Sequence, residues 1–189
     1  EFEACKDDSL GLLYIDMDDF KLYNQLYGFV EGDKALRLVA EIIKQSVGDS
    51  GMVFRYSGKV FAALLPHYDG RQAEMLAREI KKRVNALNAS PERKKFKPIT
   101  FSCGICVSPY SASTYKELID HADLAVYSAK ESGKDRIILF KGSSASFKKA
   151  SERALSIVEN TSNLSAAYQA NMTVISALTS AIDAKDHYT

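Results

Sequence analysis

A short apolar run that ends in a cluster of acids constrains the fold more than any other feature of this sequence. Residues 10–15 read Leu-Gly-Leu-Leu-Tyr-Ile and are followed directly by Asp16-Met17-Asp18-Asp19. A run of this length and character is typical of a buried strand, whose C-terminal end would deliver the acids to the edge of a sheet. The chain is therefore expected to fold around a sheet with a buried first strand.

Helical spacing of apolar residues follows that strand and returns twice. It runs through residues 20–47, where Gly28 and Gly32 are expected to divide the stretch into two helices. It returns at residues 70–87 and at 115–132, where Gly133 would end the last helix.

Strand-like runs occupy the segments between these helices. Residues 52–56 and 60–65 are separated by Ser-Gly-Lys, which predicts a β-hairpin, and further strands are expected at 99–107 and 136–140. The resulting order is βαββαβ with an extra helix and a terminal strand. It predicts an α/β (α+β) fold, a ferredoxin-like sheet with packed helices.

The composition changes after Lys141, which divides the chain into a first domain at 1–141 and a second region at 142–189. A small polar linker is followed by apolar residues that are spaced alternately three and four apart over 147–182. A 3.5-residue repeat of this length predicts a long coiled-coil helix and a homodimer formed through it. The alternative is a lone amphipathic helix that folds back on the first domain, but its period would drift toward 3.6.

Charge and composition exclude several classes of partner. Lys and Arg number 25 against 24 Asp and Glu, so no global field draws the chain to nucleic acid or to anionic lipid. No apolar run approaches the ~20 residues of a membrane span, and no leader opens the chain, so a cytoplasmic location is expected. The pair Cys103 and Cys106 lies within a predicted strand and is expected to be buried and reduced.

The acids at the end of the first strand suggest chemistry only weakly by themselves. Asp16, Asp18 and Asp19 supply the oxygen ligands that a hard cation prefers, but a solvated acidic turn is the better interpretation of three acids alone. Lysines at 21, 130 and 134 would offer positive charge to phosphates, although lysines on helix faces are usually solvated.

Several motifs share a fixed order and spacing. They are Asp16-Met17-Asp18-Asp19-Phe20-Lys21-Leu22-Tyr23-Asn24, Tyr27-Gly28, Gly32-Asp33, Arg55-Tyr56, Ala125-Val126-Tyr127-Ser128-Ala129-Lys130 and Gly133-Lys134. Together they resemble the GGDEF domain of diguanylate cyclases over roughly residues 10–141. In that family, two GTP-loaded domains meet as a dimer and form cyclic di-GMP.

The resemblance implies a guanine nucleotide site. Asn24 and Asp33 would hydrogen-bond the guanine edge, whereas adenine would leave the acid unpaired. Asp16 and the carbonyl of Met17 would bind magnesium. The remaining residues of the implied nucleotide site are Phe20, Lys21, Lys130 and Lys134, of which the lysines would contact phosphates.

The family signature is where this sequence departs from the pattern. The family has Gly-Gly-(Asp or Glu)-Glu-Phe, and this chain has Ser57-Gly58-Lys59-Val60-Phe61. Lys59 replaces a metal-binding carboxylate, and Val60 cannot activate a 3'-hydroxyl, so cyclase activity should be lost. Magnesium is expected to bind weakly or not at all, and Lys59 is expected to contact phosphates in its place.

The end of the chain suggests a partner domain. Residues 174–189 resemble the opening of an HD-GYP phosphodiesterase domain, whose metal-binding histidines would lie further on. The first hypothesis is thus an inactive domain that senses GTP and regulates a cyclic di-GMP phosphodiesterase in cis. The alternatives are a purely structural dimerisation module, with its nucleotide pocket closed by a Lys59 to Asp16 ion pair, and a residual diguanylate cyclase.

Overall fold

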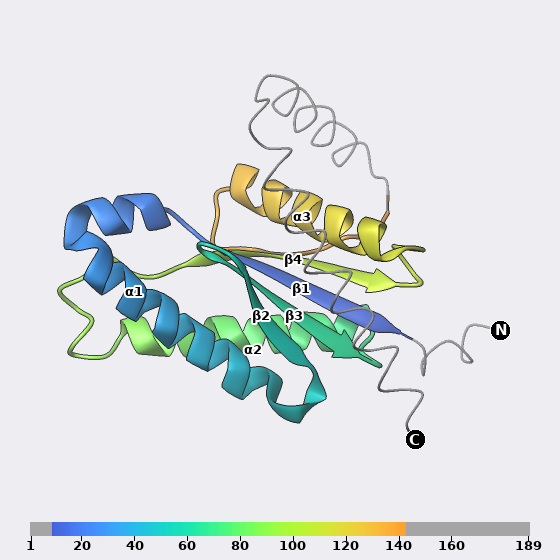
Figure 1. Ribbon diagram of the computed structural model, residues 1–189, viewed down its shortest axis with the longest axis horizontal. Coiled ribbons are helices and arrows are strands. Elements are labelled where there is room, and N and C mark those ends of the chain that lie inside the picture. The colour runs from blue at the N-terminus through green and yellow to red at the C-terminus, as the bar shows by residue number, and fades with distance from the viewer. Residues whose placement is uncertain (1–8, 143–189) are drawn as a thin grey trace. The chain divides into compact units, whose positions relative to one another are not determined.

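A computed structural model describes residues 9–142 as a mixed sheet flanked by helices (Figure 1). The elements are β1 (Leu10–Met17), α1 (Phe20–Val47), the short 3-10 helix η1 (Gly48–Ser50), β2 (Met52–Ser57), β3 (Val60–Pro66), α2 (Gly70–Asn88), β4 (Phe101–Ser108), α3 (Tyr115–Glu131) and β5 (Ile137–Leu139). Apart from η1, which the sequence analysis does not predict, each of these elements lies within a few residues of its predicted segment.

The sheet has the strand order β2-β3-β1-β4-β5. Strand β1 is central and pairs antiparallel with both β3 and β4, while β4 and β5 pair in parallel. The predicted α/β fold with helices packed on a sheet is confirmed. Because β1 has a strand on each side, its C-terminal end lies between the β2–β3 turn and the start of β4.

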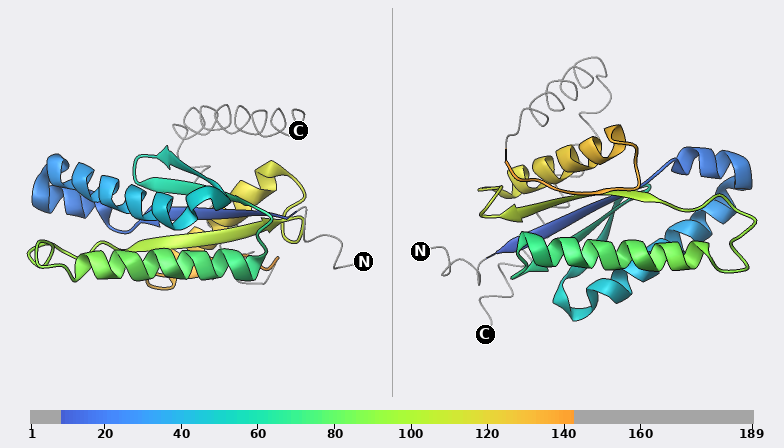
Figure 2. Two further views of the ribbon diagram at one scale, coloured as in Figure 1. Left: turned by 90° about the horizontal axis from the view of Figure 1, so that it is seen from below. Right: turned by 180° about the vertical axis from the view of Figure 1, so that it is seen from behind.

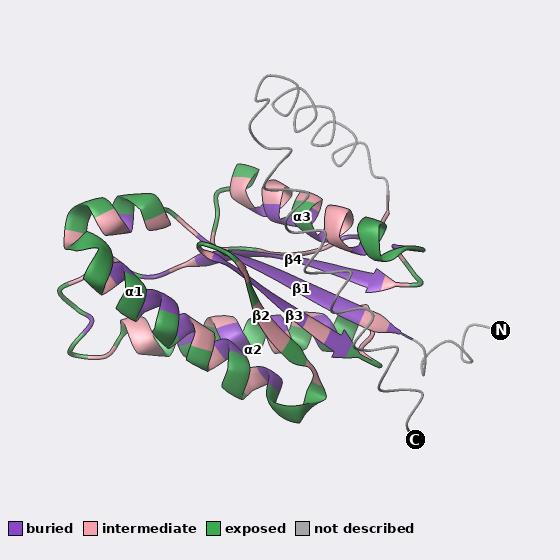
Figure 3. Ribbon diagram, in the orientation of Figure 1, coloured by how far each residue is buried: buried purple, intermediate pink, exposed green. Residues whose placement is uncertain are grey.

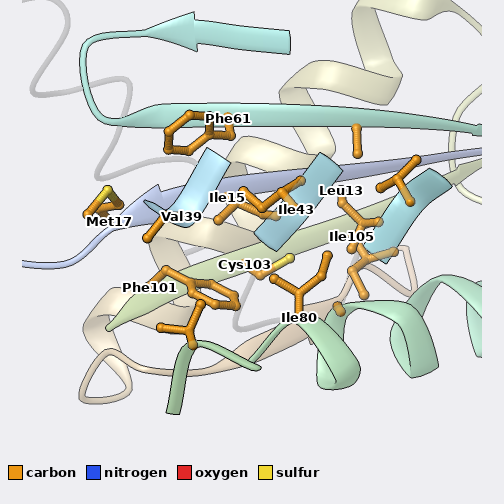
Figure 4. Close-up of a cluster of buried hydrophobic side chains, with 14 of the residues drawn as sticks. Leu13, Ile15, Met17, Val39, Ile43, Phe61, Ile80, Phe101, Cys103 and Ile105 are labelled. Carbon is orange, nitrogen blue, oxygen red and sulfur yellow. The ribbon is translucent and has the colours of Figure 1, made fainter. Parts of the chain in front are cut away.

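The two faces of the sheet bury different helices. Alternate residues of β1 point to opposite faces, so Leu13 and Ile15 join the core under α1 and α2, while Leu12 and Tyr14 join the core under α3. Figure 2 shows α1 and α2 on one side of the sheet and α3 on the other. Figure 4 shows the first of these cores, in which Ile15 lies near Ile43.

The pair Cys103 and Cys106 illustrates the same alternation. Cys103 is buried in the core under α1 and α2, and Cys106 is buried in the core under α3. Two thiols on opposite faces of one strand cannot ligate one metal ion or form a disulfide with each other. The prediction that both are buried strand cysteines is confirmed.

The two glycines of α1 behave differently from each other. Gly28 has φ 81 and ψ 162, which is outside helical geometry, and it kinks α1 as the sequence predicts. Gly32 instead continues the helix and is buried. The prediction that both glycines interrupt the helix is therefore wrong for Gly32, which has a packing role.

The central strands β1, β3 and β4 are the most deeply buried part of residues 9–142 (Figure 3). Every residue of β1 after Leu10 is buried, as the apolar run predicts. No helix within these residues is long and apolar enough to cross a membrane. The predicted coiled coil at 147–182 and the HD-GYP-like segment at 174–189 lie outside the described residues.

Candidate functional site

The C-terminal end of β1 gathers charged side chains from three parts of the chain. Asp16 lies opposite Val60 of β3 and Ser102 of β4 in the strand register. It follows Leu12 and Tyr14 at a spacing of two, so its side chain lies on the face of the sheet that α3 covers. This position brings it within reach of the β2–β3 turn and of the C-terminal end of α3.

Both carboxylate oxygens of Asp16 contact lysine ammonium groups. Lys59 Nζ, from the β2–β3 turn, lies 2.8 Å from Asp16 Oδ1, and Lys130 Nζ, from α3, donates a hydrogen bond to Oδ2. The Asp16 side chain is 12% exposed, so its charge would be costly without these partners. Oδ1 is buried and accepts no hydrogen bond of good geometry. Its contact with the Lys59 ammonium group is therefore mainly electrostatic.

Asp18 is held by the protein itself. It accepts hydrogen bonds from Thr100 Oγ1 at 3.0 Å, from Ser102 Oγ at 2.7 Å and from the backbone N–H of Asp135 at 3.0 Å. These contacts fasten the end of β1 to β4 and to the loop after α3. Asp18 therefore has a structural role.

Asp19 faces two further lysines. Lys134 Nζ donates to Asp19 Oδ1 at 2.5 Å, and Lys97 Nζ lies 3.6 Å from Oδ2. The hydrogen bond from Lys134 holds the pKa of Asp19 below its usual range, and the pKa of Lys134 is correspondingly raised. Lys134 reaches this position from a turn in which Gly133 has φ 110 and Lys134 itself has φ 61.

The three acids do not converge on a common cation site. Asp16, Asp18 and Asp19 each turn to separate partners, and no group of three or more His, Cys, Asp or Glu side chains within residues 9–142 is arranged to hold a metal. The side chain of Met17 is buried in the core, which leaves only its backbone carbonyl as a ligand. The residues present do not fit a magnesium ion, because the one buried carboxylate already faces two ammonium groups.

The other half of the site lies along α1. Asn24 Oδ1 is buried and has no hydrogen-bond partner among the described residues. A Cβ on Gly32 would lie 1.8 Å from that oxygen, so the bare backbone of Gly32 makes room for the Asn24 amide. A buried amide oxygen without a partner is unusual in a folded protein, so Asn24 Oδ1 is an unsatisfied acceptor within the described residues.

Asp33 lies beside a groove between α1 and the β2–β3 hairpin. The groove has a volume of about 470 Å³ and is also lined by Leu36, Arg55 and Phe61. Arg55 donates two hydrogen bonds to the carbonyl of Gly58, at 2.8 and 2.6 Å, and so secures the hairpin turn beside the groove. An exposed acid over apolar walls suits a flat ring with N–H donors on its edge.

The remaining predicted site residues open α1. Lys21 is exposed in the first turn, and Phe20 is half-buried, stacks on Tyr23 with ring centroids 6.4 Å apart and would touch a Cβ on Gly32. Phe20 and the Asn24 amide thus both lie close to the backbone of Gly32. Lys21 remains exposed to solvent.

Sequence reasoning missed a buried arginine behind this helix. Arg93 is 7% exposed, donates from Nη2 to the Tyr23 hydroxyl at 3.0 Å and stacks over Phe96, 4.8 Å from the ring centroid. It fixes the loop after α2 against the start of α1. The run Arg93-Lys94-Lys95 looks like a solvated basic loop in sequence, and the only available signal was the four-residue spacing of Tyr23 and Tyr27.

The family profile described as "Diguanylate cyclase, GGDEF domain" matches residues 1–136. The chain belongs to the GGDEF domain family. Diguanylate cyclase A of Treponema denticola is 32% identical over 136 residues, which cover 72% of this chain and 36% of that relative. The probable diguanylate cyclase DgcT of Escherichia coli K12 is 31% identical over 129 residues, which cover 68% of this chain and 28% of that relative.

Solved structures share the fold. A GGDEF-containing protein of M. capsulatus is 33% identical with a TM-score of 0.61, over 70% of this chain and 85% of that one. The active GGEEF domain of a diguanylate cyclase from Vibrio cholerae is 25% identical with a TM-score of 0.66, over 75% of this chain and 90% of that one. The chain thus spans most of these solved domains but well under half of the two curated relatives.

The β2–β3 turn of this GGDEF domain carries no acidic side chain. Lys59 lies in the turn and faces Asp16, while Val60 is 8% exposed and packs in the core under α3. Neither side chain supplies a carboxylate beside Asp16. The described residues therefore combine two acceptor side chains along α1, Asn24 and Asp33, with a cluster of lysines at the end of β1.

Proposed function

We propose that this GGDEF domain is catalytically inactive, binds a guanine nucleotide, GTP, and acts as a regulatory and dimerisation module of a cyclic di-GMP phosphodiesterase. The observation that carries the proposal is the division of the site. The acceptors suited to guanine, Asn24 and Asp33, are present, and Asp33 lines a groove, whereas the signature acids are replaced by Lys59 and Val60.

The base-facing half supports recognition of guanine. The N1–H and N2–H groups of guanine are adjacent donors, and a carboxylate and an amide oxygen accept from such donors. Adenine offers an acceptor at N1, so it would leave the Asp33 carboxylate without a partner. A site built to hydrogen-bond one ligand rejects an analogue that lacks the group, because its own polar atoms are left unpaired.

The phosphate-facing half argues against turnover. Cyclisation needs a base or a metal to activate the attacking hydroxyl. The position next to Asp16 in the register is Val60, which is buried among apolar side chains. The other position is Lys59, whose ammonium group already contacts Asp16. These residues support nucleotide binding without chemistry.

The blocked-pocket alternative rests on that same ion pair. Lys59 and Asp16 do lie 2.8 Å apart, as the alternative requires. The Lys59 side chain is 39% exposed, however, so its ammonium group stays accessible to a ligand while it contacts the buried Asp16 carboxylate. A triphosphate carries several charges and would compete readily for both Lys59 and Lys130, so we favour binding over blockade.

The regulatory part of the proposal rests on the sequence after Lys141. The 3.5-residue repeat at 147–182 supports a homodimer, and the resemblance of 174–189 to the start of an HD-GYP domain supports a phosphodiesterase in cis. The curated relatives extend well beyond the matched region, which is consistent with a domain that works within a longer protein.

The test is calorimetric titration with GTP and with ATP, combined with product analysis. We expect GTP to bind roughly ten- to hundredfold more tightly than ATP, since a hydrogen bond to a charged group is worth about 1.5 to 3 kcal/mol. Asp33→Ala should remove most of that preference, and Asp49→Ala, in η1, is the matched control. Incubation with GTP and manganese should yield no cyclic di-GMP. Equal affinities for GTP and ATP would contradict the base assignment, and product formation would restore the cyclase alternative.

A further inference from the structure

The strongest unexplained feature of the molecule is a pair of lysines at the place where the GGDEF family is expected to hold magnesium. Lys59 comes from the β2–β3 turn and Lys130 from the last turn of α3, and both ammonium groups meet on Asp16. Each carboxylate oxygen has its own lysine. Two elements that are far apart in sequence are thereby joined through one buried acid.

The charge on this cluster favours an anion. Two ammonium groups contact the single carboxylate of Asp16, and Asp123 of α3 also interacts electrostatically with Asp16 and Lys130, although no ion pair joins it to them within residues 9–142. The neighbouring Asp19 carries two lysines as well, Lys134 and Lys97. The end of β1 is therefore electropositive in spite of its three acids.

A divalent cation is disfavoured here by charge and by ligand count. Magnesium requires several oxygen ligands in octahedral geometry, usually with one or two carboxylates. Asp16 is the one carboxylate of this cluster, and both of its oxygens face ammonium groups that would repel the incoming ion. Asp18 is fully engaged with Thr100, Ser102 and the chain after α3.

The same two lysines are able to bind phosphate. Their side chains are 39% and 28% exposed, so both reach solvent while they contact Asp16. Each ammonium group has three donors, and contact with Asp16 occupies at most one of them. Asp16 Oδ1 accepts no well-formed hydrogen bond, so the donors of Lys59 are not committed to it. Asp16 orients the lysines, and their remaining donors are available to the oxygens of a ligand.

We infer that Lys59 and Lys130 replace the divalent cation, so that this site binds a nucleoside triphosphate without magnesium. The inference rests on the proposed function and adds the means by which the phosphates are neutralised. Asp16 acts as a positioning residue that holds the two ammonium groups, and it is not a metal ligand.

The test measures GTP affinity by calorimetry in magnesium and in a chelator, with the full chain. The unmodified protein should show affinities within about threefold of each other. Lys59→Met, which keeps the length of the side chain without its charge, should weaken binding in the chelator about tenfold or more. Lys59→Glu should make binding depend on magnesium. Lys116→Met, at the opposite end of α3 from Lys130, is the matched control and should change neither affinity.

A second readout needs no nucleotide. Manganese titration followed by electron paramagnetic resonance should show no specific site in the unmodified protein and a new one in Lys59→Glu. Tight manganese binding by the unmodified protein would overturn the inference. Loss of GTP binding in the chelator, or tighter GTP binding by Lys59→Met, would also overturn the inference. Both of these results would still leave the proposed GTP site in place. Failure to bind GTP in either medium would overturn the proposed function and this inference with it.

Discussion

Substitution of Gly32 by Ala separates nucleotide recognition from stability. The new Cβ would lie 1.8 Å from Asn24 Oδ1 and 2.9 Å from Asn24 Cγ, whereas ordinary contact begins near 3.4 Å. The amide oxygen must therefore retreat by about 1.6 Å, and a hydrogen bond does not survive such a displacement. Since Asn24 is a flexible side chain, it yields rather than the helix backbone.

Gly32→Ala should weaken GTP binding but not folding. Loss of one hydrogen bond to the base, with its donor left unpaired, costs about 1 to 2 kcal/mol, which corresponds to a roughly five- to thirtyfold weaker GTP complex. Ala in place of Gly in a helix interior is worth about 0.5 to 1 kcal/mol to the folded state. We therefore expect weaker GTP binding and an unfolding free energy that is unchanged or slightly higher.

Calorimetry and urea denaturation measure the two quantities on the same preparations. Asn24→Ala provides the reference, and the double variant closes a mutant cycle. If Gly32→Ala acts through Asn24, it should cost almost nothing further when Asn24 is already Ala. The reasoning fails if Gly32→Ala keeps the full affinity for GTP. It also fails if the affinity loss persists undiminished in the Asn24→Ala background.

Two further predictions concern the sheet. Gly104→Ala should lower the free energy of unfolding by about 3 kcal/mol or more in urea, because its Cβ would lie 1.9 Å from the backbone carbonyl of Ala122, which cannot rotate away. Gly11→Ala, whose Cβ meets ordinary contacts at 3.4 Å and beyond, should cost far less, and equal losses would contradict the steric account. Burial raises the pKa of Cys106 to about 11, so a native sample with Cys5 replaced by Ser should react very slowly with a disulfide reagent at pH 8. The stability that the protonated Cys106 thiol contributes is complete below the ordinary thiol pKa and should be lost as the pH rises toward 11. Rapid labelling of the native protein at pH 8 would contradict the burial of this thiol.

Local patterns in the sequence determined most of the fold. The apolar run at 10–15 specified a buried central strand, and the alternation of two-residue and 3.6-residue periods located the helices and the hairpin. These signals suffice because burial of one face or one stripe is a local requirement. The opposite-facing thiols of Cys103 and Cys106 follow from the same two-residue period.

The motifs also pointed to several of the charged residues that meet at the end of β1, but not to the partner that each one contacts. Asp16, Asp18 and Asp19 form one acidic cluster in sequence, yet the structure assigns them to three separate sets of partners. The partners come from β4 and the loop before it, from the β2–β3 turn, and from the end of α3 and the turn after it. Local sequence carries no information on which of these distant groups reaches which oxygen.

Only the tertiary structure revealed the roles of Gly32 and Arg93 and the joint contact of Lys59 and Lys130 with Asp16. In sequence, Gly32 is a potential helix breaker and Arg93 belongs to a basic loop. In the folded chain, Gly32 clears space for Asn24, and Arg93 is buried against Tyr23. The reason is physical: each role depends on a neighbour brought close by chain topology, and burial beside that neighbour changes what the same side chain does.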